Sequence, residues 1–198
     1  MNAGSTGSRL AIFGGTFDPI HDAHLVVART AADRFALDRV LFVPASQPPH
    51  KWGATSASYE DRYRMVELAC ADDARFVPSR IEEAASKSYS ILTIEKVKAN
   101  LQPNDELYFL IGADAFSEIL TWHRYEDVIR AVQFIVVTRP GHHYTAPEGA
   151  CIHKLETVDL PVSSSGIREI LAKGRLPVQL PHPVGQYIKA KGLYNYHA

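Results

Sequence analysis

The sequence has 198 residues, of which 46% are hydrophobic, 22% charged and 10% aromatic. This length and composition are ordinary for one globular domain, and the aromatic share argues against long disordered stretches. The formal net charge is −1 at pH 7, and no run of Lys or Arg makes a basic face. The charge balance therefore excludes a general nucleic-acid-binding or membrane-surface protein.

The first residues, 1–8, are small and polar. They lack the apolar core of a signal peptide and the Arg-rich helix of a transit peptide, and no later stretch is apolar enough to span a bilayer. We therefore expect a flexible N-terminus over residues 1–8, a single domain over residues 9–198, and a cytoplasmic protein. Cys70 and Cys151 have neither metal-type spacing nor a disulfide framework, and Cys70 is expected to be a buried thiol.

Short apolar segments of the kind that forms buried strands alternate with segments of helical period. Helical spacing of apolar residues follows the first three apolar segments, over residues 28–35, 59–69 and 91–97. The alternation predicts an α/β fold with an open, doubly wound parallel sheet of Rossmann-like type, whose ligands bind at the carboxyl ends of the strands where the strand order reverses. The expected strands are residues 10–13, 40–43, 75–77, 107–111 and 134–137.

Two further helices are expected near the C-terminus. Three serines at 163–165 can cap a short helix with apolar positions at 167, 170 and 171, which Gly174 is placed to stop. Pro183 and Gly192 bracket the last helix. Residues 141–149 contain Gly, Pro and two His, a composition typical of a surface loop.

One motif leads from the first expected strand into the first helix. Its glycines allow a bound group to approach the backbone closely, and the helix start offers free N–H groups and the positive end of the helix dipole, which favours phosphate. His21 and His24 are three residues apart, so on a helix they would point at the same ligand. The motif is Phe13-Gly14-Gly15-Thr16-Phe17-Asp18-Pro19-Ile20-His21-Asp22-Ala23-His24.

Three other kinds of site fit this motif less well. A P-loop needs a Lys after its last glycine, which is missing here, and a dinucleotide fingerprint needs an acidic residue at the end of the second strand, where the chain has Val43-Pro44-Ala45-Ser46. A zinc site would need a third ligand and usually a Glu beside the His pair. Taken alone, the motif fits a Gly-rich turn with two solvent-facing histidines equally well.

The motif resembles the first signature of the nucleotidylyltransferase superfamily, with Ala23 where the superfamily usually has Gly. A second stretch, Val162 to Arg168, resembles the superfamily's later signature, I-S-S-[ST]-x-[IV]-R. Alone, this stretch would indicate an ordinary helix N-cap with an exposed Arg. The resemblance implies that His21, His24 and Arg168 are catalytic. It implies an ATP site made of Gly14, Gly15, Thr16, Phe17, His21, His24, Ser163, Ser164, Ser165 and Arg168.

Four local matches between the signatures resemble a family within the superfamily, the bacterial nicotinate mononucleotide adenylyltransferases. The resemblance implies transfer of AMP from ATP to nicotinate mononucleotide, giving deamido-NAD and pyrophosphate. It implies a Mg²⁺ ion carried by the ATP phosphates and no protein metal ligand. The matches are Pro48-Pro49-His50-Lys51, Ser88-Tyr89-Ser90, Ile111-Gly112-Ala113-Asp114 with Trp122, and Thr138-Arg139-Pro140-Gly141.

By the same resemblance, the mononucleotide's phosphate meets His50 and Lys51, and its pyridine ring stacks on Trp122. Tyr89 and Ser90 would hold the ring's carboxylate. Asp114 would anchor the pocket, and Arg139 would lie near the phosphates. Each role has a structural alternative: Trp122 can be a packing residue, Lys51 a solvated loop residue, and Asp114 a cap of the helix at Ala115.

Four further residues have no role in either signature, and two other functions fit part of the sequence. His142 and His143 match no motif and are expected to face solvent, and Glu82 and Glu83 are expected to be an exposed acidic pair. One alternative function is that of phosphopantetheine adenylyltransferase, whose members usually carry Thr where this chain has His21. A non-catalytic module that senses ATP or NAD is the other. The sequence leaves the oligomeric state open.

Overall fold

The computed structural model describes residues 7–47, 56–83, 85, 87–139, 144–156 and 162–197. These residues form one sheet of six parallel strands in the order β3-β2-β1-β4-β5-β6. The sheet confirms the expected doubly wound, Rossmann-like fold. The strands are β1 (Arg9–Gly15), β2 (Arg39–Pro44), β3 (Phe76–Pro78), β4 (Glu106–Gly112), β5 (Gln133–Thr138) and β6 (Cys151–Glu156).

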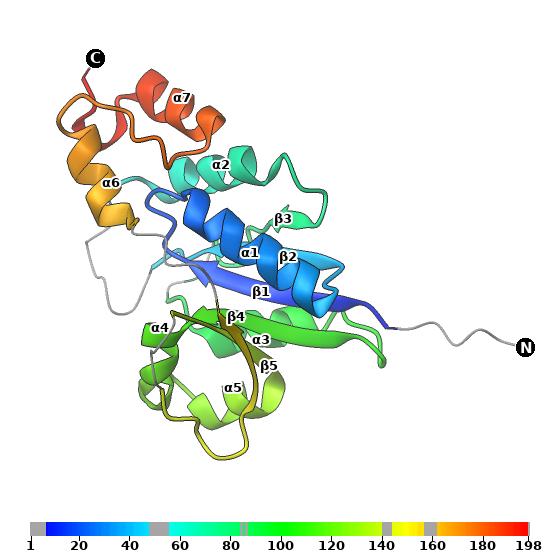
Figure 1. Ribbon diagram of the computed structural model, residues 1–198. Helices are drawn as coiled ribbons and strands as arrows, with labels where there is room; N and C mark the ends of the chain where they lie inside the picture. The colour runs from blue at the N-terminus through cyan, green and yellow to red at the C-terminus, as the bar shows by residue number, and fades with distance from the viewer. Residues whose placement is uncertain are drawn as a thin grey trace, which may run out of the picture.

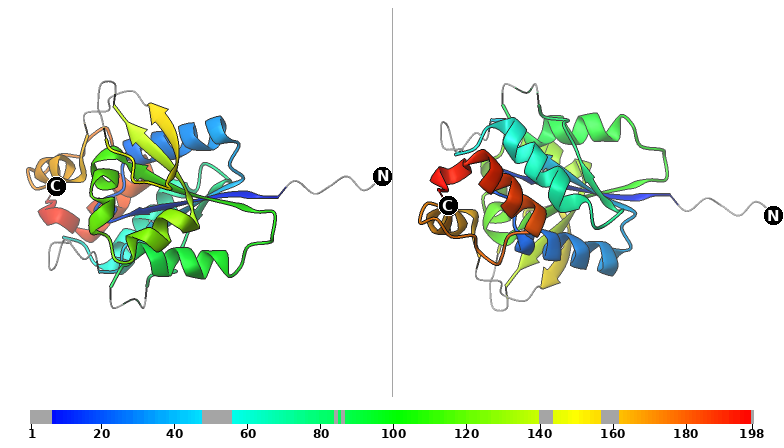
Figure 2. Two further views of the ribbon diagram at one scale, coloured as in Figure 1. Left: turned by 90° about the horizontal axis from the view of Figure 1, so that it is seen from below. Right: turned by 90° about the horizontal axis from the view of Figure 1, so that it is seen from above.

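Helices cover both faces of the sheet (Figure 1). α3, α4 and α5 lie on the face seen from below in Figure 2, and α1, α2 and α7 lie on the face seen from above. The helices are α1 (Asp22–Phe35), α2 (Tyr59–Cys70), α3 (Ser90–Lys98), α4 (Ala113–Ser117), α5 (Tyr125–Ala131), α6 (Ser164–Leu171) and α7 (His182–Lys191), with 3₁₀ turns η1 (Ile119–Thr121) and η2 (Leu193–Asn195).

Alternating strand residues feed two hydrophobic cores, because successive side chains of a strand point to opposite faces. In β1, Ala11 packs in the core beneath α1, α2, α6 and α7, whereas Ile12 packs in the core beneath α3, α4 and α5. Leu110 and Ile111 of β4 divide in the same way. Both faces of the central strands are therefore apolar, which explains their nearly continuous hydrophobic sequences.

All five expected strands are present, and the helix expected at Ala115 lies in α4, but the sequence did not indicate β6 or α5. β6 lies at the edge of the sheet and pairs with β5 alone. Half of its sequence, CIHKLE, is polar, and Leu155 is its one fully buried residue. α4 and α5 span five and seven residues, too short to display a clear helical period.

The expected cap at Ser163 and the expected helix end at Gly192 are confirmed, whereas α6 ends at Leu171, three residues before Gly174. Ser163 caps α6, since its Oγ accepts the N–H of Gly166 at 3.2 Å. Gly192, with φ of 60°, ends α7 in the left-handed conformation that glycine adopts readily. Residues 144–149 lack helix and strand, as expected of a loop, whereas His142 and His143 lie outside the described residues.

The other expectations about the chain have mixed outcomes. Ser8, the last residue of the expected N-terminal segment, is bonded at both backbone groups: its N–H donates to Asp105 Oδ1 at 2.7 Å, and its carbonyl accepts the N–H of Glu106. Cys70 is buried as expected, and burial raises its pKa to about 12. None of the helices in the described ranges is long and apolar enough to cross a membrane.

Candidate active site

The two signatures meet in space although about 145 residues separate them. α6 packs beside the loop that leads from β1 into α1 (Figure 1). Ser164 Oγ donates to the carbonyl of Pro19 at 3.0 Å, and Arg168 Nη1 donates to the carbonyl of Asp18 at 2.7 Å. Ser165 Oγ accepts from Arg168 Nη2 at 3.3 Å. The predicted ATP-binding segments therefore form one continuous surface.

The two signature histidines lie against each other at the start of α1. His21 is the N-cap residue and is 5% exposed. Its backbone N–H donates to His24 Nδ1 at 3.2 Å, and the two ring centroids are 3.8 Å apart. The helical spacing therefore brings the pair together as the sequence predicted.

Both imidazoles are neutral at pH 7. Burial lowers the pKa of His21 to about 4. Burial also lowers the pKa of His24 well below its usual value, and the neighbouring His21 lowers it further. Because Nδ1 of His24 accepts a hydrogen bond, the proton of its neutral ring resides on Nε2. His24 can therefore donate one N–H to an anion without carrying a charge itself.

An aromatic cluster fixes the position of His24. The ring of Phe17 meets His24 edge to face at a centroid distance of 5.2 Å, and Phe13 and Phe42 pack around Phe17. Phe17 has φ of 48°, an uncommon conformation for a residue with a side chain, which the packing of its ring maintains. A Cβ on Gly15 would lie 2.9 Å from that ring, so a glycine is required there.

Two buried side chains from distant segments, Arg62 and Tyr194, brace the signature loop, and no motif in the sequence indicates a role for either. Arg62 of α2 is 1% exposed and donates to the carbonyl of Thr16 at 2.7 Å. Tyr194 of η2 donates to Asp18 Oδ1 at 2.8 Å, and Asp18 Oδ2 accepts the N–H of Ser56 at 2.7 Å. Burial, followed by the Asp18 charge, raises the pKa of Tyr194 and keeps its hydroxyl protonated. The C-terminal segment thereby supports the loop that precedes the His pair.

A cavity of about 200 Å³ opens at the carboxyl ends of β1 and β4, where the strand order reverses. This is the position predicted for a ligand in a doubly wound sheet. Gly14 and Gly15 form one side, Ser88 and Ser90 lie at the start of α3, and Trp122 closes another side. The ring of Trp122 is held edge to face against Phe109 at 5.9 Å.

The remaining residues assigned to the mononucleotide are less closely grouped. Tyr89 is the N-cap of α3, and its ring stacks on His123 at 4.4 Å and does not line this cavity. Asp114 is an exposed residue in the first turn of α4, whose N-cap is Gly112, so Asp114 is not the cap. Arg139 is exposed just beyond the end of β5. His50 and Lys51 lie outside the described residues.

Glu82 and Glu83 do not form the expected exposed pair. Glu83 is exposed and pairs with Arg80 at 2.7 Å. Glu82 is 8% exposed and lines the same cavity as Ser90 and Trp122. The expectation was wrong for Glu82 because residues 81–83 form a turn that directs its side chain against Thr93, one helical turn beyond Ser90. Thr93 Oγ1 donates to Glu82 Oε1.

A second, more open cavity of about 310 Å³ lies beside Arg168. Ser56, Ser165, Tyr194 and Asn195 contribute to its lining. Arg168 keeps 28% of its side chain exposed there. The described part of the chain holds no group of three or more His, Cys, Asp or Glu side chains that could form a metal site.

Comparison with known proteins agrees with this geometry. Residues 12–170 match the cytidylyltransferase-like family. A protein of Solibacter usitatus, named probable nicotinate-nucleotide adenylyltransferase, is 60% identical over 187 residues, which cover 94% of this chain and 100% of that protein. A protein of the same name from Saccharopolyspora erythraea is 41% identical over 192 residues, covering 94% of this chain and 89% of that protein.

A solved structure shares the fold. The nicotinic acid mononucleotide adenylyltransferase of Plasmodium falciparum, complexed with NaAD, superposes with a TM-score of 0.77 at 20% identity, over 96% of this chain and 98% of that one. At this identity the likeness concerns the fold alone. Together with the matches in sequence, it shows that the chain is a nucleotidyltransferase of the cytidylyltransferase-like family and belongs, within it, to the nicotinate-nucleotide adenylyltransferases.

Proposed function

We propose that this enzyme transfers AMP from ATP to nicotinate mononucleotide and releases pyrophosphate, forming deamido-NAD. The observation that carries the proposal is the junction of the two signatures, which brings Arg168 against the loop that leads to the His pair. Gly14 and Gly15 of the same first signature line the cavity at the β1 and β4 strand ends. Relatives across almost the full length of the chain are named for the same activity. Neither adenylyl transfer to phosphopantetheine nor a purely sensory role has comparable support.

The reaction proposed is an in-line attack of the mononucleotide's phosphate oxygen on the α-phosphorus of ATP. Because this oxygen is already an anion, no general base is needed, and catalysis consists of alignment and charge stabilisation. In this scheme His24 donates its Nε2–H to an α-phosphate oxygen, with His21 beside it. Arg168 and the serine-capped start of α6 bind the leaving pyrophosphate, as a guanidinium fork and free backbone N–H groups suit phosphate oxygens.

We further propose that Mg²⁺ enters with the triphosphate. The donors around the signature loop are imidazole, hydroxyl and backbone N–H groups, which suit phosphate oxygens better than a Mg²⁺ ion. The ion would be held by the ATP phosphates and water, where it neutralises their charge. Removing divalent cations with EDTA should abolish turnover, and added Mg²⁺ should restore it.

Pyrophosphate release tests the proposed function directly. The purified protein should release pyrophosphate when ATP and nicotinate mononucleotide are both present, and not with phosphopantetheine. Release with ATP and phosphopantetheine, but not with ATP and nicotinate mononucleotide, would indicate a phosphopantetheine adenylyltransferase instead. Binding of ATP without release, whichever acceptor is supplied, would make the protein a nucleotide sensor.

Replacing Arg168 by alanine is expected to weaken ATP and pyrophosphate binding by about 1.5 to 3 kcal/mol, the usual loss for a charge-assisted hydrogen bond. The KM of the mononucleotide should change much less. Arg168→Lys is the matched control, because it keeps the charge but loses the planar fork, and it should recover part of the affinity. An equal rise in both KM values would contradict a separate triphosphate site.

Replacing Trp122 by alanine is expected to raise the KM of the mononucleotide and leave that of ATP nearly unchanged. The indole forms a wall of the cavity and would supply a stacking surface worth about 0.5 to 1.5 kcal/mol beyond the area it buries. Trp122→Phe keeps an aromatic surface and should retain most of the affinity. The melting temperature of both variants should be measured as a control, because Trp122 also packs on Phe109. A loss of stability with an unchanged KM would make Trp122 a packing residue.

A further inference from the structure

One residue of the cavity wall, Glu82, has a buried carboxylate oxygen without a hydrogen-bond partner among the described residues. Glu82 Oε1 accepts from Thr93, but Oε2 is buried and has no hydrogen-bond partner among the described residues. Glu82 is also the one ionisable side chain among the described residues that line this cavity. A buried carboxylate oxygen without a partner costs free energy, and a bound group that completes its bonding is one explanation for its presence in a native structure.

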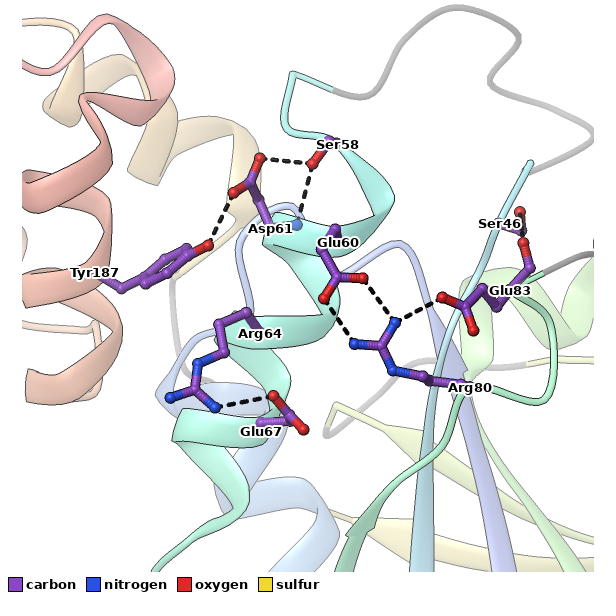
Figure 3. Close-up of polar contacts among 9 residues, drawn as sticks. All are labelled: Ser46, Ser58, Glu60, Asp61, Arg64, Glu67, Arg80, Glu83 and Tyr187. Carbon is purple, nitrogen blue, oxygen red and sulfur yellow. Dashed lines mark hydrogen bonds and ion pairs between the residues drawn. The ribbon is translucent and has the colours of Figure 1, made fainter.

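The nearest cation on the same segment does not neutralise Glu82. Arg80 donates to both oxygens of Glu60 at 2.7 Å and to Glu83 Oε1 at 2.7 Å (Figure 3). Its guanidinium is therefore committed to two other carboxylates. The hydroxyl of Tyr59 is buried as well, and its pKa is raised to about 12 by burial, by the charge of Glu83 and, to a smaller extent, by that of Glu82. Within the described residues, neither Arg80 nor another cation forms an ion pair with Glu82.

The acceptor under the proposed function would bring the missing positive charge. A pyridine ring joined to ribose through its nitrogen is a quaternary cation, and in nicotinate mononucleotide it also carries a carboxylate. The start of α3 at Ser90 suits that carboxylate, because free N–H groups and the helix dipole favour an anion. An acidic residue in the same wall would oppose the carboxylate, but it is complementary to the cationic ring.

We propose that Glu82 is a specificity-determining residue that supplies the buried counter-charge for the pyridinium ring of the acceptor. The proposal rests on the proposed function, since it concerns how the same cavity recognises its mononucleotide. In it, Thr93 positions Glu82 by donating to Oε1, and the carboxylate in the cavity wall acts on the ring through its charge. The cavity thereby distinguishes a cationic ring from a neutral ring of the same shape.

The first test is the isosteric variant Glu82→Gln, which removes the charge and keeps an oxygen that can accept from Thr93. Its KM for nicotinate mononucleotide should rise by about 10-fold to 100-fold, while the KM of ATP stays unchanged. The nicotinamide mononucleotide carries the same ring charge, so its KM should rise by a similar factor. Glu83→Gln is the matched control: it removes the same charge from the adjacent, exposed residue and should leave both KM values near those of the wild type.

The second test changes the ligand and needs no variant. The 1,4-dihydro forms of the two mononucleotides carry the same substituents on an uncharged ring, and their affinity can be measured by competition or calorimetry. The wild-type enzyme should bind each dihydro form at least about 10-fold more weakly than the matching pyridinium form. The Glu82→Gln variant should bind the two forms with nearly equal affinity.

Three outcomes would overturn the proposal. Equal affinity of the wild-type enzyme for the neutral and the cationic rings would exclude Glu82 as a counter-charge. A Glu82→Gln variant that changes the ratio between acid and amide acceptors would place Glu82 against the ring's substituent instead. A lower melting temperature with unchanged KM values would make Glu82 a structural residue. Failure of the proposed function is distinguishable, because the wild-type enzyme would then release no pyrophosphate with either pyridine mononucleotide.

Discussion

Replacing His24 by alanine is expected to lower kcat by about 10² or more, because the charge that develops on the α-phosphate loses a positioned donor. The structure specifies that donor as Nε2–H, since Nδ1 already accepts the backbone N–H of His21. Because His24 is neutral and partly buried, its N–H is held in one orientation, and little water has to be removed from it when the phosphate binds. Replacing His21 by alanine should have a smaller effect of the same kind.

Two polar substitutions separate the catalytic role of His24 from its role in capping α1. His24→Asn places an oxygen near the position of Nδ1, so it keeps the acceptor for the His21 N–H but removes the outer donor. His24→Gln reaches to the position of Nε2 and should restore part of kcat. Steady-state kinetics, with circular dichroism and thermal melting as controls, measure both. Near-normal kcat in a folded alanine or asparagine variant would make the His pair structural.

A second large effect is expected between two acceptors: the enzyme should prefer nicotinate mononucleotide over the nicotinamide form by roughly 10-fold to 10⁴-fold in kcat/KM. The reason lies at the N-terminus of α3, where Ser90 borders the cavity and the first turn of the helix offers backbone N–H groups. A carboxylate accepts at both oxygens. A carboxamide turns its NH₂ toward one of those donors and so loses a charge-assisted bond.

The buried position of Glu82 sharpens this comparison. If Glu82 contacted the ring's substituent, it would accept from the NH₂ of the amide and oppose the acid, which would reduce or reverse the preference. As a counter-charge to the ring, it would affect both acceptors alike and leave the preference intact. Measuring kcat/KM for the two mononucleotides at equal ATP, in the wild type and in Glu82→Gln, distinguishes these cases. A wild-type ratio near one, or a preference for the amide, would contradict the nicotinate assignment and leave adenylyl transfer standing.

The sequence by itself determined the parallel sheet and the two signature segments. Both are encoded by neighbouring residues: apolar runs long enough for buried strands, and the chemistry of a glycine-rich turn, a His pair and a serine-capped helix. Because parallel strands place their carboxyl ends on one edge, the motifs that follow strands were expected to meet there. Ser90 and Trp122 do border the cavity at that edge.

Only the tertiary structure decided which polar groups are buried around that cavity. Arg62 contacts a carbonyl 46 residues away, and Tyr194 reaches Asp18 across 176 residues. Glu82 was expected to be exposed beside Glu83, because adjacent acidic residues normally remain in water. Its burial depends on a turn that folds against Thr93 of α3, and the charge patterning of the local sequence contains no signal for that packing. Burial and partners arise from contacts between distant segments, which is why the burial of Glu82 could not be predicted from the sequence alone.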